Sequence, residues 1–368
     1  MNIHKLVAIA DKKRASDLHL VLASPPLLRI DGALEPVENS ALLTTEEITE
    51  AFVQITTAAE RKVFNKYKEI DFGYTMPDIG RLRCNAAQQR GSISLAIRLL
   101  PPIILSISEL ELPDIYKKIA LEHKGLVVIS GPTDSGKTTT IASMIQYINT
   151  LESRHIVTIE DPIEYVYTNL KSAISQRELG RDTLSFANAL KHILRQSPDV
   201  IVVGEMRDLE TAAAVLTIAE TGHLVLTTGH APSAHQAIER VIDLFPHDER
   251  HLAQTRLASL LIAVFCQTLV SRAGGSGRIA AVEIMLASPS VRSLIREGKI
   301  YQLPNIIRTN HDIGMISYDE SLVNLYKRGA IELKTLYATC NSHKEVEKLL
   351  DLATKENKKL ENETGIAI

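Results

Sequence analysis

The chain has 368 residues, of which 45% are hydrophobic and 23% charged, so it is long enough for two globular domains with buried cores. Its formal net charge is −3, and aromatic residues make up only 4% with no tryptophan, which disfavours a free-standing nucleic-acid binder. The three cysteines are scattered without CxxC spacing, so we expect neither a disulfide framework nor a zinc site.

Residues 1–100 are predicted to form a mixed α/β domain. Residues 16–21 alternate between apolar and polar like a half-buried strand. Residues 27–34 contain an Asp-Gly pair at Asp31, which is typical of a two-residue hairpin turn. Thr44 is followed three positions later by a glutamate, and this N-cap signal predicts a helix.

A second hairpin is predicted to carry arginines on one polar side. Its strands are 81–87 and 92–98, which both alternate with a period of two. Arg81 and Arg83 share one face of the first strand, and Arg98 lies on the polar face of the second. From the pattern alone, arginines exposed to solvent are an equally acceptable interpretation.

Residues 101–113, which begin with two prolines, are predicted to be an interdomain linker, and residues 114–368 a second domain with a helical C-terminal region. From residue 125 on, short apolar strands alternate with helices, as in a parallel sheet covered on both faces. The expected strands are 126–130, 156–159, 200–203, 224–227 and 278–286, and the expected helices are 138–151, 186–195, 209–220, 233–244 and one from Ser288.

A glycine-rich loop follows the first of these strands. Residues 131–138 have the form GxxxxGK[ST], whose backbone N–H groups face an anion while the next helix adds a partial positive charge. Lys137 can reach the β- and γ-phosphates, and the hydroxyl of Thr138 can hold Mg²⁺. We therefore expect a nucleoside triphosphate here rather than a simple turn. The expected binding residues are Gly131, Thr133, Ser135, Gly136, Lys137, Thr138 and Thr139.

Acidic residues follow two other strands. Glu205 ends an apolar strand, and ligands of open α/β sheets bind at that edge. A carboxylate there can hold the water shell of Mg²⁺ or polarise the attacking water. Glu160, Asp161 and Glu164 follow the strand 156–159. Three neighbouring acids repel one another unless a cation such as Mg²⁺ offsets their charge. Alternatively, they could lie at the N-terminus of a helix, where the helix dipole favours negative charge.

Two histidines and two arginines flank these strands. His223 and His230 bracket the strand 224–227, and a histidine there can hydrogen-bond a γ-phosphate or play a purely structural part. Arg195 and Arg207 bracket the strand that ends in Glu205. Either arginine could stabilise transition-state charge or pair with a nearby acid.

The longest apolar run is residues 257–270, which is too short to cross about 30 Å of hydrocarbon as a helix. We expect it to form a buried helix. The first residues become charged too soon, at Asp11, for a signal peptide. We therefore expect a cytoplasmic protein with no direct membrane insertion.

Together these motifs resemble the secretion-superfamily hexameric ATPases and, within them, the type IV pilus retraction ATPases. The resemblance extends from about Ala15 to Gly329, and residues 290–297 are similar to a signature of the retraction branch. The matching runs are the Walker A run 131–138, the Asp box 158–164, the Walker B run 198–211 and the His box 219–230.

The resemblance implies an N-terminal PAS-like domain joined to a RecA-like P-loop domain with a mostly parallel sheet. It implies a homohexameric ring that hydrolyses ATP with Mg²⁺ and powers pilus retraction and twitching motility. The implied partner is an inner-membrane platform protein at the inner face of the cell membrane. A paralogous retraction ATPase is a further candidate partner, and no nucleic acid is expected.

The resemblance also implies roles for single residues. Glu164 would orient or deprotonate the attacking water, and Glu205 would be the Walker B acid. Thr138, Glu205 and Glu160 would hold Mg²⁺, largely through water. The residues expected to sense or stabilise the phosphates are His223, His230, Arg83, Arg98, Arg195 and Arg207.

Two departures from the family pattern keep alternatives open. Asp134 stands where the family usually has glycine, and Gly229 replaces the usual leucine before His230. Asp134 adds negative charge beside a polyphosphate, so a weakly hydrolysing accessory partner of the motor is one alternative. A pilus assembly or type II secretion ATPase is another, but such chains commonly carry an extra N-terminal domain and a four-cysteine zinc motif, and this sequence has neither.

Overall fold

The computed structural model describes residues 1–30, 32–77, 79–100, 103–275 and 277–351. The chain divides into an N-terminal unit, Met1–Ile104 with Glu160–Thr168, and a second unit, Leu105–Ile159 with the chain from Asn169 onward. Asp31 of the predicted turn, the two prolines of the predicted linker and residues 352–368 lie outside the described residues. The domain limits given above stay a prediction, and nothing in the sequence indicated that Glu160–Thr168 groups with the N-terminal unit.

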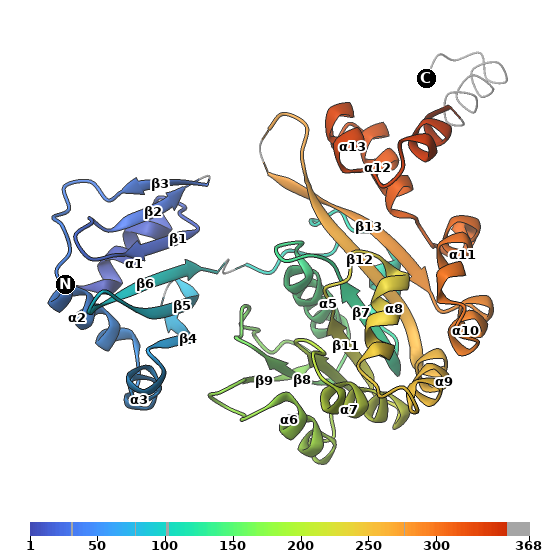
Figure 1. Cartoon of the computed structure of the whole chain (residues 1–368), viewed down its shortest axis with the longest axis horizontal. Coiled ribbons are helices and arrows are strands. Elements are labelled where there is room, and N and C mark those ends of the chain that lie inside the picture. The colour runs from blue at the N-terminus through green and yellow to red at the C-terminus, as the bar shows by residue number, and fades with distance from the viewer. Residues whose placement is uncertain (31, 78, 101–102, 276, 352–368) are drawn as a thin grey trace. The chain divides into compact units, whose positions relative to one another are not determined.

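The N-terminal unit is a six-stranded antiparallel sheet in the order β3-β2-β1-β6-β5-β4, with three helices (Figure 1). The capping box of Thr44 and Glu47 starts α2 as predicted, and a second box at Thr57 starts α3. The strands are β1 Asp17–Leu20, β2 Leu27–Ile30, β3 Ala33–Pro36, β4 Glu69–Met76, β5 Gly80–Gln89 and β6 Ser92–Leu99, and the helices are α1 Ile3–Lys12, α2 Thr45–Ile55 and α3 Ala58–Tyr67.

The register of this sheet separates an apolar face from a polar one. Leu18 lies opposite Ile97, which lies opposite Cys84, and these three side chains are fully buried in the core that α1 and α2 complete. One residue further along each strand, the side chains point to the other face. Asp17, Arg98 and Arg83 therefore form a polar row across three adjacent strands.

Arg81 fastens the segment Glu160–Thr168 to this sheet. It is only 8% exposed, and its guanidinium donates to Thr75 Oγ1 at 3.1 Å and to the carbonyl of Ile163 at 3.3 Å. The guanidinium lies over Gly73, where an added Cβ would be 2.0 Å from Arg81 Nη2. Glycine at this position makes the contact between Arg81 and the segment possible.

The second unit contains a seven-stranded sheet in the order β13-β12-β7-β11-β10-β8-β9. Strands β12, β7, β11, β10 and β8 are parallel, and β13 runs antiparallel to β12 at the edge. The strands are β7 Gly125–Ser130, β8 His155–Glu160, β9 Ala173–Glu178, β10 Val200–Val203, β11 Leu224–Thr228, β12 Leu261–Ser271 and β13 Arg278–Leu286.

Helices surround this sheet, and the central strands are buried along their whole length, as expected for a parallel sheet (Figure 1). The fold class and all five strands predicted for this part are confirmed. The helices are α4 Ile115–Ala120, α5 Lys137–Leu151, α6 Phe186–Ile193, α7 Leu209–Glu220, α8 Ala234–Asp243, α9 Arg250–Leu260, α10 Pro289–Arg296, α11 Leu303–Thr309, α12 Tyr318–Lys327 and α13 Leu333–Thr339, with 3-10 turns η1 Leu194–Gln196, η2 Ile300–Gln302 and η3 His311–Ile313.

The prediction that residues 257–270 form a buried helix is wrong. Helix α9 ends at Leu260, and the rest of the run is β12, which pairs with β7 on one side and β13 on the other. A strand buried on both faces is apolar throughout, so its sequence has no alternation that separates it from a buried helix. No helix within the described ranges is long and apolar enough to span a bilayer.

We predict that Gly73→Ala destabilises the chain by about 1–3 kcal/mol, because the new methyl group would overlap the Arg81 guanidinium. Urea denaturation of the variant measures the loss. The control is the same substitution in an Arg81→Ala background, where the overlap is gone and Gly73→Ala should cost much less. An equal cost in both backgrounds would contradict the proposed overlap.

Candidate functional site

The phosphate loop, residues 131–136, connects β7 to α5 and is packed tightly against β12. Gly131 has φ +146°, and a Cβ there would lie 2.2 Å from the carbonyl oxygen of Gln267. Gly136 is the N-cap of α5 with φ +84°. Both positions therefore require glycine, one for its close approach to a strand and the other for its left-handed backbone.

The loop has features that fit a phosphate group. Lys137 Nζ donates to the carbonyls of Gly131 and Pro132 at 2.8 and 2.7 Å, so its positive charge lies against the loop. Ser135 is 2% exposed, and its buried hydroxyl oxygen has no hydrogen-bond partner among the described residues. The first turn of α5 adds N–H groups that have no carbonyl partner within the helix, together with the positive end of the helix dipole.

The structure accommodates Asp134 without burying its charge. Its backbone has φ +60°, in the left-handed region that glycine adopts freely and that aspartate tolerates better than most residues. The residue is exposed. Its negative charge nevertheless lies one residue from the buried Ser135 hydroxyl.

A pocket of about 330 Å³ is lined by Gly136 and by segments that are distant from it in the sequence. Leu105 and Leu110 precede α4, while Leu269 and Ile279 come from β12 and β13. Arg272 at its rim pairs with Glu111 at 2.6 Å. No sequence motif predicted that these residues line a pocket, because they come together only when β12 pairs with β7 in the sheet.

Glu205 follows β10 at the carboxyl edge of the parallel sheet, as the sequence predicted. Its side chain is 13% exposed and lies between Arg207, with Nε to Oε1 at 2.5 Å, and His230, with Nε2 to Oε2 at 3.4 Å. The structure thus brings together three of the predicted site residues. Gly229, the residue before His230, packs closely against β7, since a Cβ at that position would be 3.0 Å from Ser130 Oγ.

The N-terminal unit brings together three other site residues. Arg83 and Arg98 are direct cross-strand partners, so both arginines lie on one face as the alternation predicted. Like charges in that position repel unless acids offset them. Asp17 Oδ1 lies 3.0 Å from Arg98 Nε, and Glu164 Oε1 lies 3.7 Å from Arg83 Nη1.

The charged neighbours of Asp17 in this row shift the pKa of its carboxyl group. Partial burial acts to raise the pKa of its carboxyl, but hydrogen bonds from Ser16 and Arg98 and the positive charge of Arg98 outweigh burial and lower the pKa overall. Asp17 is therefore charged at neutral pH and holds Arg98 in place.

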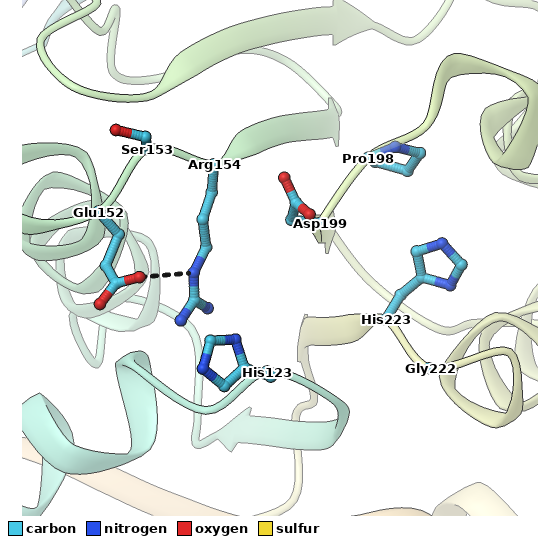
Figure 2. Close-up of a pocket in the computed structure, with 8 residues that line it drawn as sticks. All are labelled: His123, Glu152, Ser153, Arg154, Pro198, Asp199, Gly222 and His223. Atoms are coloured by element: carbon cyan, nitrogen blue, oxygen red, sulfur yellow. Dashed lines mark ion pairs between the residues drawn. The ribbon is translucent and has the colours of Figure 1, made fainter.

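The structure places His223 away from the phosphate loop of its own chain, and its predicted contact with phosphate stays a prediction. His223 precedes β11, so the whole strand separates it from the loop at the opposite edge. Figure 2 shows it at a pocket of about 350 Å³ that His123, Arg154 and Asp199 also line. Its Nδ1 lies 3.0 Å from Thr221 Oγ1 and 3.1 Å from the carbonyl of Ile218, as in a structural histidine.

Arg195 and Glu205 lie at opposite ends of strand β10. It is exposed in η1, before the start of β10, whereas Glu205 follows the end of that strand. Of the two bracketing arginines, only Arg207 reaches the acid.

The Mg²⁺ ligands stay a prediction. Glu160 is the last residue of β8 and the first of the segment that groups with the N-terminal unit. Within the described parts of the chain, no group of three or more His, Cys, Asp or Glu side chains is arranged to hold a metal ion.

The sequence profile described as Type II/IV secretion system protein matches residues 2–317. The chain is 42% identical to the type IV pilus retraction ATPase PilT of Pseudomonas aeruginosa, over 90% of this chain and 96% of that protein. It is 43% identical to a twitching motility protein of Neisseria gonorrhoeae, over 83% and 82% of the two chains. A crystal structure of the pilus retraction motor PilT with bound ADP superposes with a TM-score of 0.88 at 39% identity, covering 95% of this chain and 99% of that one.

We predict that Asp134→Gly lowers the dissociation constant for ADP about two- to tenfold, because it removes both a negative charge and a left-handed aspartate from the loop. Calorimetric titration measures the change, which should shrink as salt is added. Asp134→Asn is the control, since it removes the charge alone. Unchanged affinity in both variants would show that Asp134 does not weaken the site.

We predict that Asp17→Asn lowers the free energy of unfolding by about 1 kcal/mol at pH 7. The lowered pKa of Asp17 means that its stabilising contribution is present above the unfolded-state pKa near 4 and is lost as the pH falls through the lower folded-state value. Urea titrations should therefore show a smaller difference from wild type at pH 3. The exposed Glu35→Gln is the control; a difference for Asp17→Asn that grows toward pH 3 would contradict the assignment.

Proposed function

Because the chain belongs to the Type II/IV secretion system protein family, we propose that it is an ATP-hydrolysing motor that drives type IV pilus retraction and twitching motility. The observation that carries the proposal is the phosphate loop, whose Lys137 and Ser135 lie at the same carboxyl edge of the sheet as Glu205 and His230. A site of this kind needs only positioning and electrostatic stabilisation to transfer a phosphoryl group.

The nucleotide would lie along the start of α5. Its phosphates would contact the backbone N–H groups of residues 131–136, the Lys137 ammonium and the hydroxyl of Ser135. Its base and ribose would enter the 330 Å³ pocket beside Gly136, where Leu269 and Ile279 offer apolar surface. The crystal structure of the 39% identical retraction motor contains bound ADP, which supports an adenine nucleotide as the ligand.

Mg²⁺, when bound, would neutralise charge on the phosphate oxygens. Thr138 would hold this ion through its hydroxyl, and Glu205 and Glu160 would hold it through water. Arg207 contacts one carboxylate oxygen of Glu205 and His230 contacts the other, so the carboxylate is oriented for this role.

The hydrolytic step needs a base and a source of positive charge. Glu164 would orient or deprotonate the water that attacks the γ-phosphorus, with ADP as the leaving group. Arg83 and Arg98 would supply positive charge from the N-terminal unit, and Arg207 from the second unit. His230 would sense the phosphate through its contact with Glu205.

The working form would be a homohexameric ring in the cytoplasm that acts on an inner-membrane platform protein. A paralogous retraction ATPase would be a further partner. A second candidate function is that of a weakly hydrolysing accessory subunit, which the negative charge of Asp134 in the phosphate loop favours.

We predict that Lys137→Ala lowers kcat for ATP hydrolysis at least 100-fold, because it removes the ammonium group that lies against the phosphate loop. A phosphate-release assay with Mg²⁺ measures turnover. Lys299→Ala is the control, since that exposed lysine pairs only with Glu297 in the described structure. Turnover that persists in Lys137→Ala would contradict catalysis at this loop.

We predict that cells without the protein carry more and longer pili, because filaments would extend without being withdrawn. Electron microscopy of deletion and complemented strains provides the measurement. Bald cells would indicate an assembly motor, and unchanged piliation would favour the accessory role.

A further inference from the structure

We propose that Gln267 is a positioning residue that fixes the shape of the phosphate loop for nucleotide binding. The inference rests on the proposed function, because it assigns a role in holding the nucleotide phosphates. Gln267 lies in a strand rather than in any motif, inside the apolar run that the sequence suggested was a helix.

Strand β12 brings Gln267 to the loop because it is longer than its neighbour. Cys266 pairs with Ser130, the last residue of β7, and β12 continues to Ser271. The residue after Cys266 therefore lies beside the first residue of the loop. The 2.2 Å separation between a Cβ built at Gly131 and the Gln267 carbonyl oxygen shows how close this approach is.

The side-chain amide of Gln267 makes two hydrogen bonds, one to the phosphate loop and one to helix α5. Nε2 donates to the carbonyl of Ser135 at 2.7 Å, and Oε1 accepts from Thr140 Oγ1 at 3.0 Å. Gln267 and Thr140 are each 2% exposed. A buried amide is tolerated only when its polar atoms are paired, so these two bonds hold the side chain in one orientation.

The bond to Ser135 has a consequence for anion binding. In a trans peptide the C=O and the following N–H point in opposite directions. Since Gln267 holds the Ser135 carbonyl toward β12, the N–H of Gly136 is directed to the other side of that peptide. Gly136 is the N-cap of α5, and a Cβ there would be 3.2 Å from Gln267 Nε2, so the same amide also requires glycine at the helix start.

The test compares Gln267→Met, which keeps an unbranched side chain of similar size but loses both bonds, with Thr140→Val and the double variant. Ser172→Ala is the matched control. Ser172 is 3% exposed and also makes two buried hydrogen bonds, to Glu152 O at 2.7 Å and from Arg154 N at 3.3 Å, at the other edge of the sheet. The four variants and the wild-type protein are all used at full length.

Three quantities are measured: the dissociation constant for ADP, the stability to urea, and hydrogen–deuterium exchange of residues 131–137 without nucleotide. We expect Gln267→Met to raise the dissociation constant about tenfold and to speed exchange in the loop. The double variant should be little worse than Gln267→Met, because both substitutions break the same link. Ser172→Ala should lose similar stability with unchanged affinity and loop exchange.

Gln267→Met with wild-type affinity and loop exchange, and only the loss of stability seen in Ser172→Ala, would overturn the inference. Fully additive effects of Gln267→Met and Thr140→Val would also contradict it. A wild-type protein that takes up no ADP would instead overturn the proposed function. In that case the exchange data would still decide whether Gln267 fixes the loop.

Discussion

The contact between the phosphate loop and β12 is the constraint on which the second unit depends. Gly131 can approach the Gln267 carbonyl only because it has no side chain, and Gly136 can start α5 only from a left-handed backbone. The approach requires β12 to be a strand in the sheet, parallel to β7 and longer than it. The same strand then supplies a wall of the pocket beside the loop.

In each unit, an acid assigned to the proposed chemistry has an arginine partner. Glu205 pairs with Arg207, and Glu164 pairs with Arg83. In the N-terminal sheet the repulsion between neighbouring Arg83 and Arg98 is relieved by Glu164 on one side and Asp17 on the other. These pairs hold the side chains in position by Coulomb attraction.

Local signals in the sequence predicted much of the fold and part of the site. The capping residue Thr44, the glycines of the loop and the acid that ends β10 each act through their own neighbours, so a single sequence reveals them. The identity of β12 and the position of His223 depend instead on strand order. His223 and His230 are close in sequence, yet the length of β11 places them at opposite edges of the sheet. Long-range pairing of this kind has no local signature.

The division of the chain into units shows that the backbone passes between them three times, after Ile104, after Ile159 and after Thr168. The second and third crossings enclose Glu164, and Arg81 ties the stretch between them to the N-terminal sheet. The stretch that carries Glu164 therefore belongs to the N-terminal unit, although it lies in the sequence between two strands of the second unit, β8 and β9.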